Sequence, residues 1–316
     1  MEALIFDTHR GTSHDGEGLR TTFFFQGCPL RCKWCHNPEG IPPEPYVKWE
    51  ARKCIGCRAC VKACPGKFLE FAEEGPRIDR NRCTRCGACT KRCPSKALQI
   101  SAGAWTVDEL AAYALKDKHF YDAFNGGVTF SGGEAALHTP FILEAAERLH
   151  AAGIHVALDT SGYCAPQLFE TVFPSFDSIL FDLKIADEER HKKFTGAGNA
   201  LILENLARIV RKKRSGEYAG ELWIRTPIIP DATDTEENIL SIAEIIRTCH
   251  DAISRWELCA FNNMCKSKYR SLGLEWEYMD TDLLSHARMR ELFQIAEKVI
   301  GNRVSLLSTG LTAQDR

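Results

Sequence analysis

The chain has 316 residues, of which 44% are hydrophobic and 26% charged, and its formal net charge is −2. This composition is typical of a globular protein with one sizeable domain and a smaller one. With a pI of about 6.6, nothing favours a nucleic-acid or lipid partner. The first residues do not form a secretory signal, and no stretch approaches the roughly 20 apolar residues of a membrane helix. We therefore expect a cytoplasmic protein that acts as a monomer.

Fifteen cysteines are unusual in such a chain, and eleven of them fall between residues 28 and 93. Proteins held together by many disulfides are usually short and secreted, whereas this chain is long and has no secretory signal. Dense cysteine in this context predicts metal or cluster ligation.

Composition divides the chain into three parts. Residues 1–40 contain a strand-like run, Arg20–Gln26, followed by the first cysteine group. Residues 41–104 begin with the turn-rich segment Ile41–Pro45 and contain two similar cysteine blocks. Helices and strands alternate over residues 105–316. We predict that the middle part is an insert, and that the first and last parts together form the main domain.

The last part is predicted to alternate regularly. A helix over Val107–Lys118 precedes a strand over Gly127–Phe130. Thr139 is expected to cap the next helix, with Pro140 in its first turn and Gly153 as its stop. The remaining predicted elements are strands at 154–158, 178–183, 221–229 and 256–261, and helices at 199–213, 234–249 and 283–300.

This alternation predicts a parallel sheet with helical crossovers, and so an α/β fold. Counting the strand at 20–26 gives six βα units, fewer than the eight of a closed barrel, which indicates an open partial barrel. The helix at 234–249 begins with Asp234 and Glu237 in capping-box spacing. Polar residues follow the strands at their carboxyl ends, where such folds place their chemistry: Cys28, Ser131–Glu134, Asp159, Thr160, Asp182, Lys184, Arg225 and Asn262.

The first cysteine group is Cys28, Cys32 and Cys35, in C-x3-C-x2-C spacing directly after the first strand. Three thiolates can hold three irons of a 4Fe–4S cluster and leave the fourth iron open to a ligand. A structural zinc site is the alternative, and it needs a fourth ligand. His36 is adjacent to Cys35 and poorly placed to be that ligand. The group therefore favours a catalytic cluster, as in the radical S-adenosylmethionine superfamily that it resembles.

The second and third groups repeat the two-cluster ferredoxin pattern C-x2-C-x2-C-x3-C-P. In that pattern the fourth cysteine of each run ligates the other cluster. The predicted ligand sets are therefore Cys54, Cys57, Cys60 and Cys93 for one cluster, and Cys83, Cys86, Cys89 and Cys64 for the other.

Residues 50–96 contain twelve Lys and Arg against five Asp and Glu. Positive charge compensates the anionic, thiolate-ligated clusters, which is the interpretation that we favour. The alternative is a docking surface for an acidic electron donor such as a flavodoxin or ferredoxin.

Several strings over residues 3 to 270 together resemble the glycyl radical enzyme activating enzymes, a family within the radical S-adenosylmethionine superfamily. The insert resembles that of the larger members, which serve arylacetate decarboxylases, choline lyase, benzylsuccinate synthase and diol dehydratases. The strings that carry the resemblance are His14–Arg20, Phe25–Cys28, Trp34–Asn37, Gly126–Glu134, Leu158–Gly162, Phe181–Lys184 and Trp223–Arg225.

The resemblance implies an enzyme with three 4Fe–4S clusters that reductively cleaves S-adenosylmethionine and removes a hydrogen atom from a backbone glycine of a partner enzyme. It implies that Gly132, Gly133 and Glu134 contact the amino group of S-adenosylmethionine. Lys184, together with Arg225, is expected to meet its carboxylate.

The resemblance also implies that Trp34 and His36 lie beside the adenine. Asp159, Thr160 and Asp182 match a monovalent cation site of the family.

Three further positions complete the expected site. The resemblance implies that Asp15 lies where the partner's glycine loop enters, and that Leu183 is among the cofactor-binding residues. Asn262 stands where formate-lyase activating enzymes have a histidine, so it offers a hydrogen bond but no titratable group.

Simpler roles remain open for some of these residues. Asp15 can be part of a turn, Asp182 and Lys184 can form an ion pair because they share a strand face, and Arg225 can pair with a core carboxylate. Cys164, Cys249, Cys259 and Cys265 are expected to be buried small apolar residues. Two other functions also remain open: an iron–sulfur electron carrier without catalysis, and a radical enzyme that acts on a small molecule or another residue.

Overall fold

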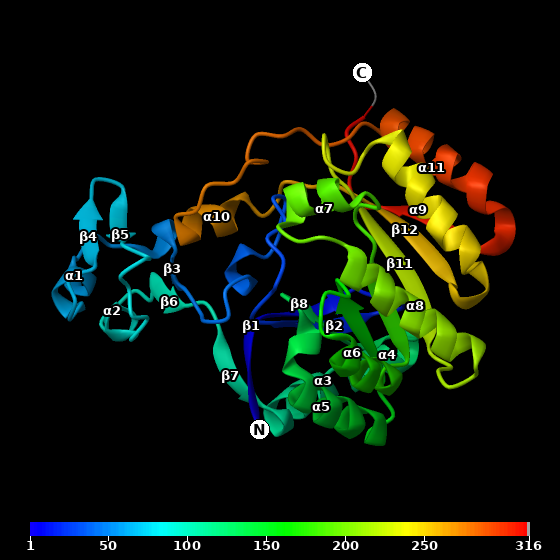
Figure 1. Ribbon diagram of the computed structural model, residues 1–316. Coiled ribbons are helices and arrows are strands. Elements are labelled where there is room, and N and C mark those ends of the chain that lie inside the picture. The colour runs from blue at the N-terminus through cyan, green and yellow to red at the C-terminus, as the bar shows by residue number, and fades with distance from the viewer. Residues whose placement is uncertain (315–316) are drawn as a thin grey trace.

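The computed structural model describes residues 1–314, and Figure 1 shows a main domain with a small insert at one side. The main sheet has nine strands in the order β13-β12-β11-β10-β9-β8-β2-β1-β7. These strands are β1 (Glu2–Thr12), β2 (Arg20–Phe25), β7 (Gly103–Thr106), β8 (Gly127–Gly132), β9 (His155–Thr160), β10 (Ser178–Asp182), β11 (Glu221–Ile228), β12 (Arg255–Ala260) and β13 (Ser305–Thr309). No helix within this part of the chain is long and apolar enough to cross a membrane.

Strands β2 and β8 to β13 run parallel to one another, whereas β1 lies antiparallel between β2 and the edge strand β7. The two edge strands, β7 and β13, lie at opposite ends of the order, so the barrel is open. The predicted α/β partial barrel is therefore confirmed. Strands β1, β7 and β13 were not predicted from the sequence. They are short or largely polar, and they lie at or near the sheet edges.

The helices cover one face of the sheet (Figure 1). That face carries the large hydrophobic core, with residues such as Phe130, Leu158 and Trp256 at 0% exposure. The helices of the main domain are α3 (Val107–Leu115), α4 (Lys118–Phe124), α5 (Thr139–Ala151), α6 (Pro166–Val172), α7 (Glu188–Thr195), α8 (Ala200–Arg214), α9 (Glu236–Thr248), α10 (Lys266–Leu272) and α11 (His286–Ile300).

The opposite, inner face of the sheet is different in character. Ala157, Leu180 and Trp223 form a small apolar cluster of their own on it. Because side chains alternate along strands, the residues two places further along these strands, Asp159, Asp182 and Arg225, share this face. The inner face therefore carries a polar layer at the carboxyl ends of its strands.

Three details of the predicted helices are wrong. The helix expected over Val107–Lys118 ends at Leu115, because Asp117 leaves the helical conformation and its buried carboxylate accepts a hydrogen bond from Thr21 (2.9 Å). Arg10 forms a two-point ion pair with the same carboxylate. The N-terminus of α3 is nevertheless capped, by a capping box of Thr106 and Glu109.

The other two corrections concern helix starts. The N-cap of α9 is Thr235, whose hydroxyl accepts from the amide of Asn238, and not Asp234. Thr139 is the first residue of α5 and does not cap it, since its hydroxyl donates to the carbonyl oxygen of Ala136 (2.8 Å) in the preceding turn.

The insert has a short two-part repeat. Its elements are β3 (Val47–Trp49), α1 (Ala59–Ala63), β4 (Leu69–Ala72), β5 (Gly75–Ile78), α2 (Ala88–Lys91) and β6 (Leu98–Ile100). It has its own hydrophobic cluster, which includes Val47, Leu69 and Leu98 as well as two cysteines. The chain rejoins the main sheet at β7, so residue 104, where the sequence analysis ended the insert, lies inside a strand of the main domain.

Candidate active site and cluster-binding sites

The first three cysteines lie in a loop that directly follows β2, and we call residues 27–37 the cysteine loop. The end of α7 holds this loop, because the amide of Arg31 donates to the carbonyl of Thr195 (2.7 Å) and that of Lys33 to Phe194 (3.0 Å). At its start, the amide of Gly27 donates to the carbonyl of Gly40 (2.8 Å). Backbone bonds to other segments therefore define the loop's position in the main domain.

The structure brings Cys28, Cys32 and Cys35 together. Burial raises the pKa of all three thiols, that of Cys28 to about 12, and the neighbouring Cys32 raises the pKa of both Cys28 and Cys35 further by charge repulsion. The amide of Asn37 donates to the sulfur of Cys35 at 3.4 Å. Three converging, half-buried cysteines with a backbone donor fit thiolates bound to iron, since iron charge would replace the protons.

A chain of polar side chains crosses the inner face beside this loop. Ser131 donates to Asp159 at 2.6 Å, and Asp159 lies 3.4 Å from the guanidinium of Arg225. Burial raises the pKa of Asp159 to about 6, although Arg225 opposes the shift. Arg225 also lies 3.5 Å from Glu257 on β12. Glu257 was not among the site residues predicted from the sequence. Its position on the same strand face as Cys259, two residues further on, could have indicated that it lies on the inner face.

Lys184 and Asp182 form an ion pair, which is the simpler role left open for them. Lys184 is only 9% exposed, and the cysteine loop lies close enough for Cys32 to raise its pKa. Burial lowers the pKa of Lys184 and the carboxylates raise it, with a net increase. The ammonium group thus stays charged between the loop and the polar layer. Leu183, between the two, is buried and donates its amide to Arg225 (2.9 Å).

Glu134 is fully buried, and every neighbour of its carboxylate is a donor. One oxygen accepts from the hydroxyl of Thr160 (2.6 Å) and the amide of Ala136 (3.3 Å). The other accepts from the amide (2.9 Å) and hydroxyl (2.5 Å) of Ser161. Thr160 and Glu134 are therefore joined to each other, and Thr160's hydroxyl does not point to Asp159.

The two glycines before Glu134 are required by the packing of β8 against β2. A Cβ atom at Gly132, whose φ is +115°, would lie 2.2 Å from the amide nitrogen of Phe25. One at Gly133 would lie 2.1 Å from the carbonyl oxygen of Gly27. Without side chains, the two glycines let the backbone approach the start of the cysteine loop, and the amide of Gly133 donates to the carbonyl oxygen of Phe25 (2.8 Å).

Two of the predicted adenine-side residues, Trp34 and His36, belong to the cysteine loop itself. Trp34 is buried beside Phe194. The ring of His36 lies 6.2 Å from that of Phe261, and burial lowers its pKa. Its Nε2 atom is buried and has no hydrogen-bond partner among residues 1–314, which fits a polar ligand at that point. Asn262 lies beside His36 and accepts from the amide of Met264 (3.2 Å).

Asp15 lies in the loop between β1 and β2. Its carboxylate accepts from Thr22 (2.8 Å) and Thr12 (3.1 Å), so it is tied to the inner face of β2. The carbonyl of His14 accepts from Arg225 on β11 (3.3 Å). This loop therefore reaches over the inner face to a strand four places away in the sheet.

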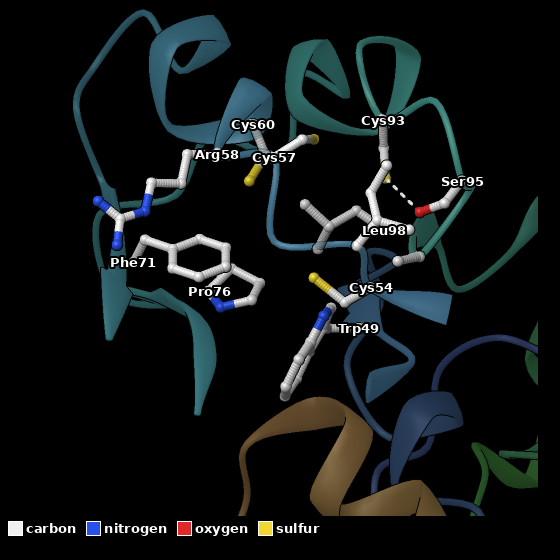
Figure 2. A pocket seen from close by; sticks show the side chains of 12 residues that line it. Trp49, Cys54, Cys57, Arg58, Cys60, Phe71, Pro76, Cys93, Ser95 and Leu98 are labelled. Atoms are coloured by element: carbon white, nitrogen blue, oxygen red, sulfur yellow. Dashed lines mark hydrogen bonds between the residues drawn. The ribbon is translucent and has the colours of Figure 1, made fainter. Parts of the chain in front are cut away.

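The insert contains two cavities lined by cysteines, with about 290 and 380 Å³ of space between their atoms. The first is lined by Cys54, Cys57, Cys60 and Cys93, all four of which Figure 2 shows around it together with Trp49 and Phe71. The second is lined by Cys64, Cys83, Cys86 and Cys89. The fold thus groups the cysteines in the same crossed sets that the sequence pattern predicts.

Each cavity also provides a donor to the sulfur of its crossed cysteine. The amide of Phe68 donates to Cys64 at 3.3 Å. Ser95 lies 3.7 Å from the sulfur of Cys93, as the dashed line in Figure 2 marks. Such donors suit thiolate ligands. Cys57 and Cys86 are the exposed cysteines of the two sets.

Other expectations for cysteine and metal sites have the following outcomes. Cys164, Cys249 and Cys265 are buried, whereas Cys259 is only half-buried, beside Arg225 on the inner face. Within residues 1–314, no group of three or more His, Cys, Asp or Glu side chains is arranged for a single metal ion.

Family models match along the chain. Residues 80–243 match the radical SAM superfamily, residues 53–97 a 4Fe-4S dicluster domain and residues 14–65 a 4Fe-4S single cluster domain. The Streptococcus suis protein SuiB bound to precursor peptide SuiA has a similar fold, with a TM-score of 0.52 at 12% identity over 90% of this chain and 46% of that one.

The chain is also similar to curated proteins over almost its whole length. It is 36% identical to the 4-hydroxyphenylacetate decarboxylase activating enzyme of Clostridioides difficile (strain 630), over 93% of both chains. It is 35% identical to the (2S)-3-sulfopropanediol dehydratase activating enzyme of Klebsiella oxytoca, again over 93% of both chains.

Proposed function

Because this chain belongs to the glycyl radical enzyme activating enzymes of the radical SAM superfamily, we propose that it reductively cleaves S-adenosylmethionine and installs a glycyl radical on a partner enzyme. The observation that carries the proposal is the position of Cys28, Cys32 and Cys35. These thiols converge next to the polar layer of an open barrel, and the buried cation Lys184 lies beside them. That arrangement can hold a reactive cluster and a charged small molecule together.

When bound to the three thiols, a 4Fe–4S cluster with one open iron supplies the electron that breaks the sulfonium C–S bond of S-adenosylmethionine. The chain's own residues bind and orient that molecule. Lys184 and Arg225 offer positive charge to its carboxylate, and both would have to share that charge with Asp182 and Asp159. Backbone atoms of Gly132, Gly133 and Glu134 are the proposed contacts for its amino group.

The proposal places the adenine near His36, whose unpartnered Nε2 can take part in a hydrogen bond, with Trp34 behind it. Asn262 would supply a further hydrogen bond. Asp159, Thr160 and Asp182 remain a proposed monovalent cation site. Burial, and with it the charge of Asp182, raises the pKa of Asp159, and a cation bound between the two carboxylates would stabilise their charged forms.

Asp15 and the loop around it are the proposed entry point for the partner's glycine loop. The loop lies over the inner face and contacts Arg225 through the carbonyl of His14. A backbone segment of the partner that displaced this contact would reach the polar layer beside the cysteine loop. The hydrogen atom would then be taken from its glycine.

We further propose that the insert binds two more 4Fe–4S clusters, on the crossed cysteine sets, which makes three in total. The exposed cysteines Cys57 and Cys86 are the proposed contact area for a flavodoxin or ferredoxin that reduces the clusters, and positive charge left over from cluster compensation would attract such an acidic donor. A cytoplasmic location and a monomeric state belong to the same proposal.

An anaerobic assay tests the function. The protein is reconstituted with iron and sulfide, reduced with dithionite and given S-adenosylmethionine, with and without a candidate glycyl radical enzyme. We expect 5′-deoxyadenosine and a glycyl radical EPR doublet on the partner. Deoxyadenosine with no doublet on any candidate would instead indicate a radical enzyme with another target. No deoxyadenosine at all would leave only an electron carrier.

A further inference from the structure

The cysteine loop is hydrogen-bonded to a segment that has no role in the proposed function. This segment, residues 263–284, lies between β12 and α11 and contains α10. Tyr269 on α10 donates its hydroxyl hydrogen to the carbonyl oxygen of Cys35 at 2.9 Å. Trp276 donates from Nε1 to the carbonyl oxygen of Lys33 at 3.1 Å. Two aromatic donors thus hold alternate peptide groups of the cysteine loop.

The two rings also fix each other. They are stacked, with centroids 5.0 Å apart and an angle of 14° between their planes. Both side chains are 6% exposed. Buried, stacked rings with few torsions lose little further freedom when they donate, so their hydrogen bonds are well oriented. We call this pair, Tyr269 and Trp276, the aromatic brace.

A charged residue of α10 also contacts the end of the cysteine loop and the residues just after it. The ammonium of Lys268 donates to the side chain of Asn37 at 2.7 Å and lies 2.8 Å from Glu39. Asn37 is the residue whose amide donates to the sulfur of Cys35. Both the carbonyl and the sulfur of Cys35 are therefore connected to α10, directly or through one residue.

The same helix contacts the insert. α10 packs on β3, and Figure 1 shows it between the insert and the rest of the main domain. The helix therefore joins the element that leads to the insert's cysteines with the loop that carries the catalytic cysteines. The family's chemistry needs the cysteine loop to hold its shape while its cluster changes charge.

We propose that the aromatic brace positions Cys35, and that Tyr269 is a positioning residue for the reductive cleavage of S-adenosylmethionine; this rests on the proposed function. The brace acts through the backbone of the cysteine loop. Tyr269 holds the carbonyl of Cys35, and the amide of the same residue donates to the carbonyl of Cys32 (3.0 Å). A shift of the Cys35 peptide group therefore changes the spacing of two ligands. Partners that orient a metal ligand in this way typically change affinity or activity about tenfold or more when removed.

The test compares Tyr269→Phe with wild type in the fully reconstituted protein. Tyr278→Phe is the matched control, because it removes a hydroxyl from the same segment, where Tyr278 packs on Phe261. Three quantities are measured: iron content, the EPR spectrum of the reduced protein with and without S-adenosylmethionine, and the rate of deoxyadenosine formation. We expect Tyr269→Phe to keep the insert's cluster signals, to alter the spectrum induced by S-adenosylmethionine, and to form deoxyadenosine about tenfold more slowly. Tyr278→Phe should match wild type.

The proposal is overturned if Tyr269→Phe has the wild-type spectrum and rate, or if both variants change equally. Should Tyr269→Phe fail to fold, Trp276→Phe is assessed by the same criteria, since it removes the other donor of the brace. Failure of the proposed function would give a different result, because the wild-type protein itself would then show no spectral response to S-adenosylmethionine and form no deoxyadenosine.

Discussion

At the scale of single residues, a buried carboxylate whose hydrogen-bond partners are all donors makes a conservative change informative. Glu134 is the clearest case, because its two carboxylate oxygens face four donors. Hydroxyl groups can rotate and become acceptors, but the amides of Ala136 and Ser161 cannot. Each oxygen has one of these amides.

We therefore predict that Glu134→Gln lowers the free energy of unfolding by about 1–3 kcal/mol, because the new NH2 group must face an N–H donor in either orientation. We also expect weaker binding of S-adenosylmethionine, since Gly133 and Glu134 share one turn. Denaturant unfolding and equilibrium binding measure the two effects. The control is Glu147→Gln, at an exposed position of α5. Equal stability of the two variants would contradict the interpretation of the buried network.

A second residue-scale prediction concerns the two cluster sites of the insert. Ser95 follows Cys93-Pro94 and contacts the Cys93 sulfur, whereas Gly66 follows Cys64-Pro65 at the equivalent place. Once a thiolate binds iron it has no proton, so the serine hydroxyl must be the donor. Hydrogen bonds to cluster sulfurs stabilise the reduced state.

Ser95→Gly should therefore shift one insert cluster to a more negative potential, on the order of the 59 mV that a tenfold change in a one-electron equilibrium represents. The other cluster, whose Cys64 sulfur has the amide of Phe68 as its donor, should keep its potential and serves as the internal control. Gly66→Ser is not a suitable counterpart, because a Cβ atom there would lie 2.0 Å from the ring of Phe68. Redox titration followed by EPR measures both. If Ser95→Gly moves neither potential, the contact does not tune the cluster.

At the scale of elements, β2 and β9 are held in place by a buried arginine. Arg20 is 0% exposed and donates to Thr129 (2.7 Å), the carbonyl of Val128 (2.6 Å) and Nδ1 of His155 (3.2 Å). Because arginine only donates, His155 must accept, which requires an unprotonated Nδ1. Burial, and then the charge of Arg20, lower the pKa of His155.

This arrangement predicts a pH dependence of stability. The unfolded histidine has a pKa of about 6.5, and the folded one is lower, so the unfolded state binds the proton more readily. The contribution of His155 is complete above about pH 6.5 and is lost as the pH falls through the folded-state pKa. His155→Gln, which keeps an acceptor without titrating, should reduce the loss of unfolding free energy between pH 7.5 and 5.5. His119→Gln, at an exposed site, should leave the slope unchanged. A wild-type slope in the His155 variant would disprove this role.

At the scale of the whole molecule, two parts with separate cores carry separate sets of cysteines. The insert's hydrophobic cluster contains Cys60 and Cys89, while Cys32 packs against the main core. The loss of one cluster should therefore leave the others in place.

Cys32→Ala should abolish cleavage of S-adenosylmethionine and leave about eight of about twelve irons. Cys57→Ala should spare the catalytic cluster, and Cys93→Ala should lose the same cluster as Cys57→Ala because the sets are crossed. Iron analysis and EPR give the outcomes. Loss of all iron in the Cys32 variant would contradict separate parts, and full activity in the Cys57 variant would assign the insert a structural role.

The sequence alone was sufficient for the fold class and for the three cysteine groups. Alternating helices and strands indicate a parallel sheet because the connection between parallel strands must cross over. The spacing of the cysteines indicates clusters because ligands a few residues apart are brought together by the local turn alone. The crossed sets were predicted from the two-cluster ferredoxin pattern as a whole, in which the fourth cysteine of each run ligates the other cluster.

Only the tertiary structure decided which partners the polar residues have. Arg225, Asp159 and Glu257 meet because β9 to β12 pair in one register, and a shift by one residue would turn these side chains to the opposite face. Likewise, the brace of Tyr269 and Trp276 depends on a segment more than 200 residues from the loop that it holds. Local spacing carries no information about such contacts, because they are set by how distant elements pack.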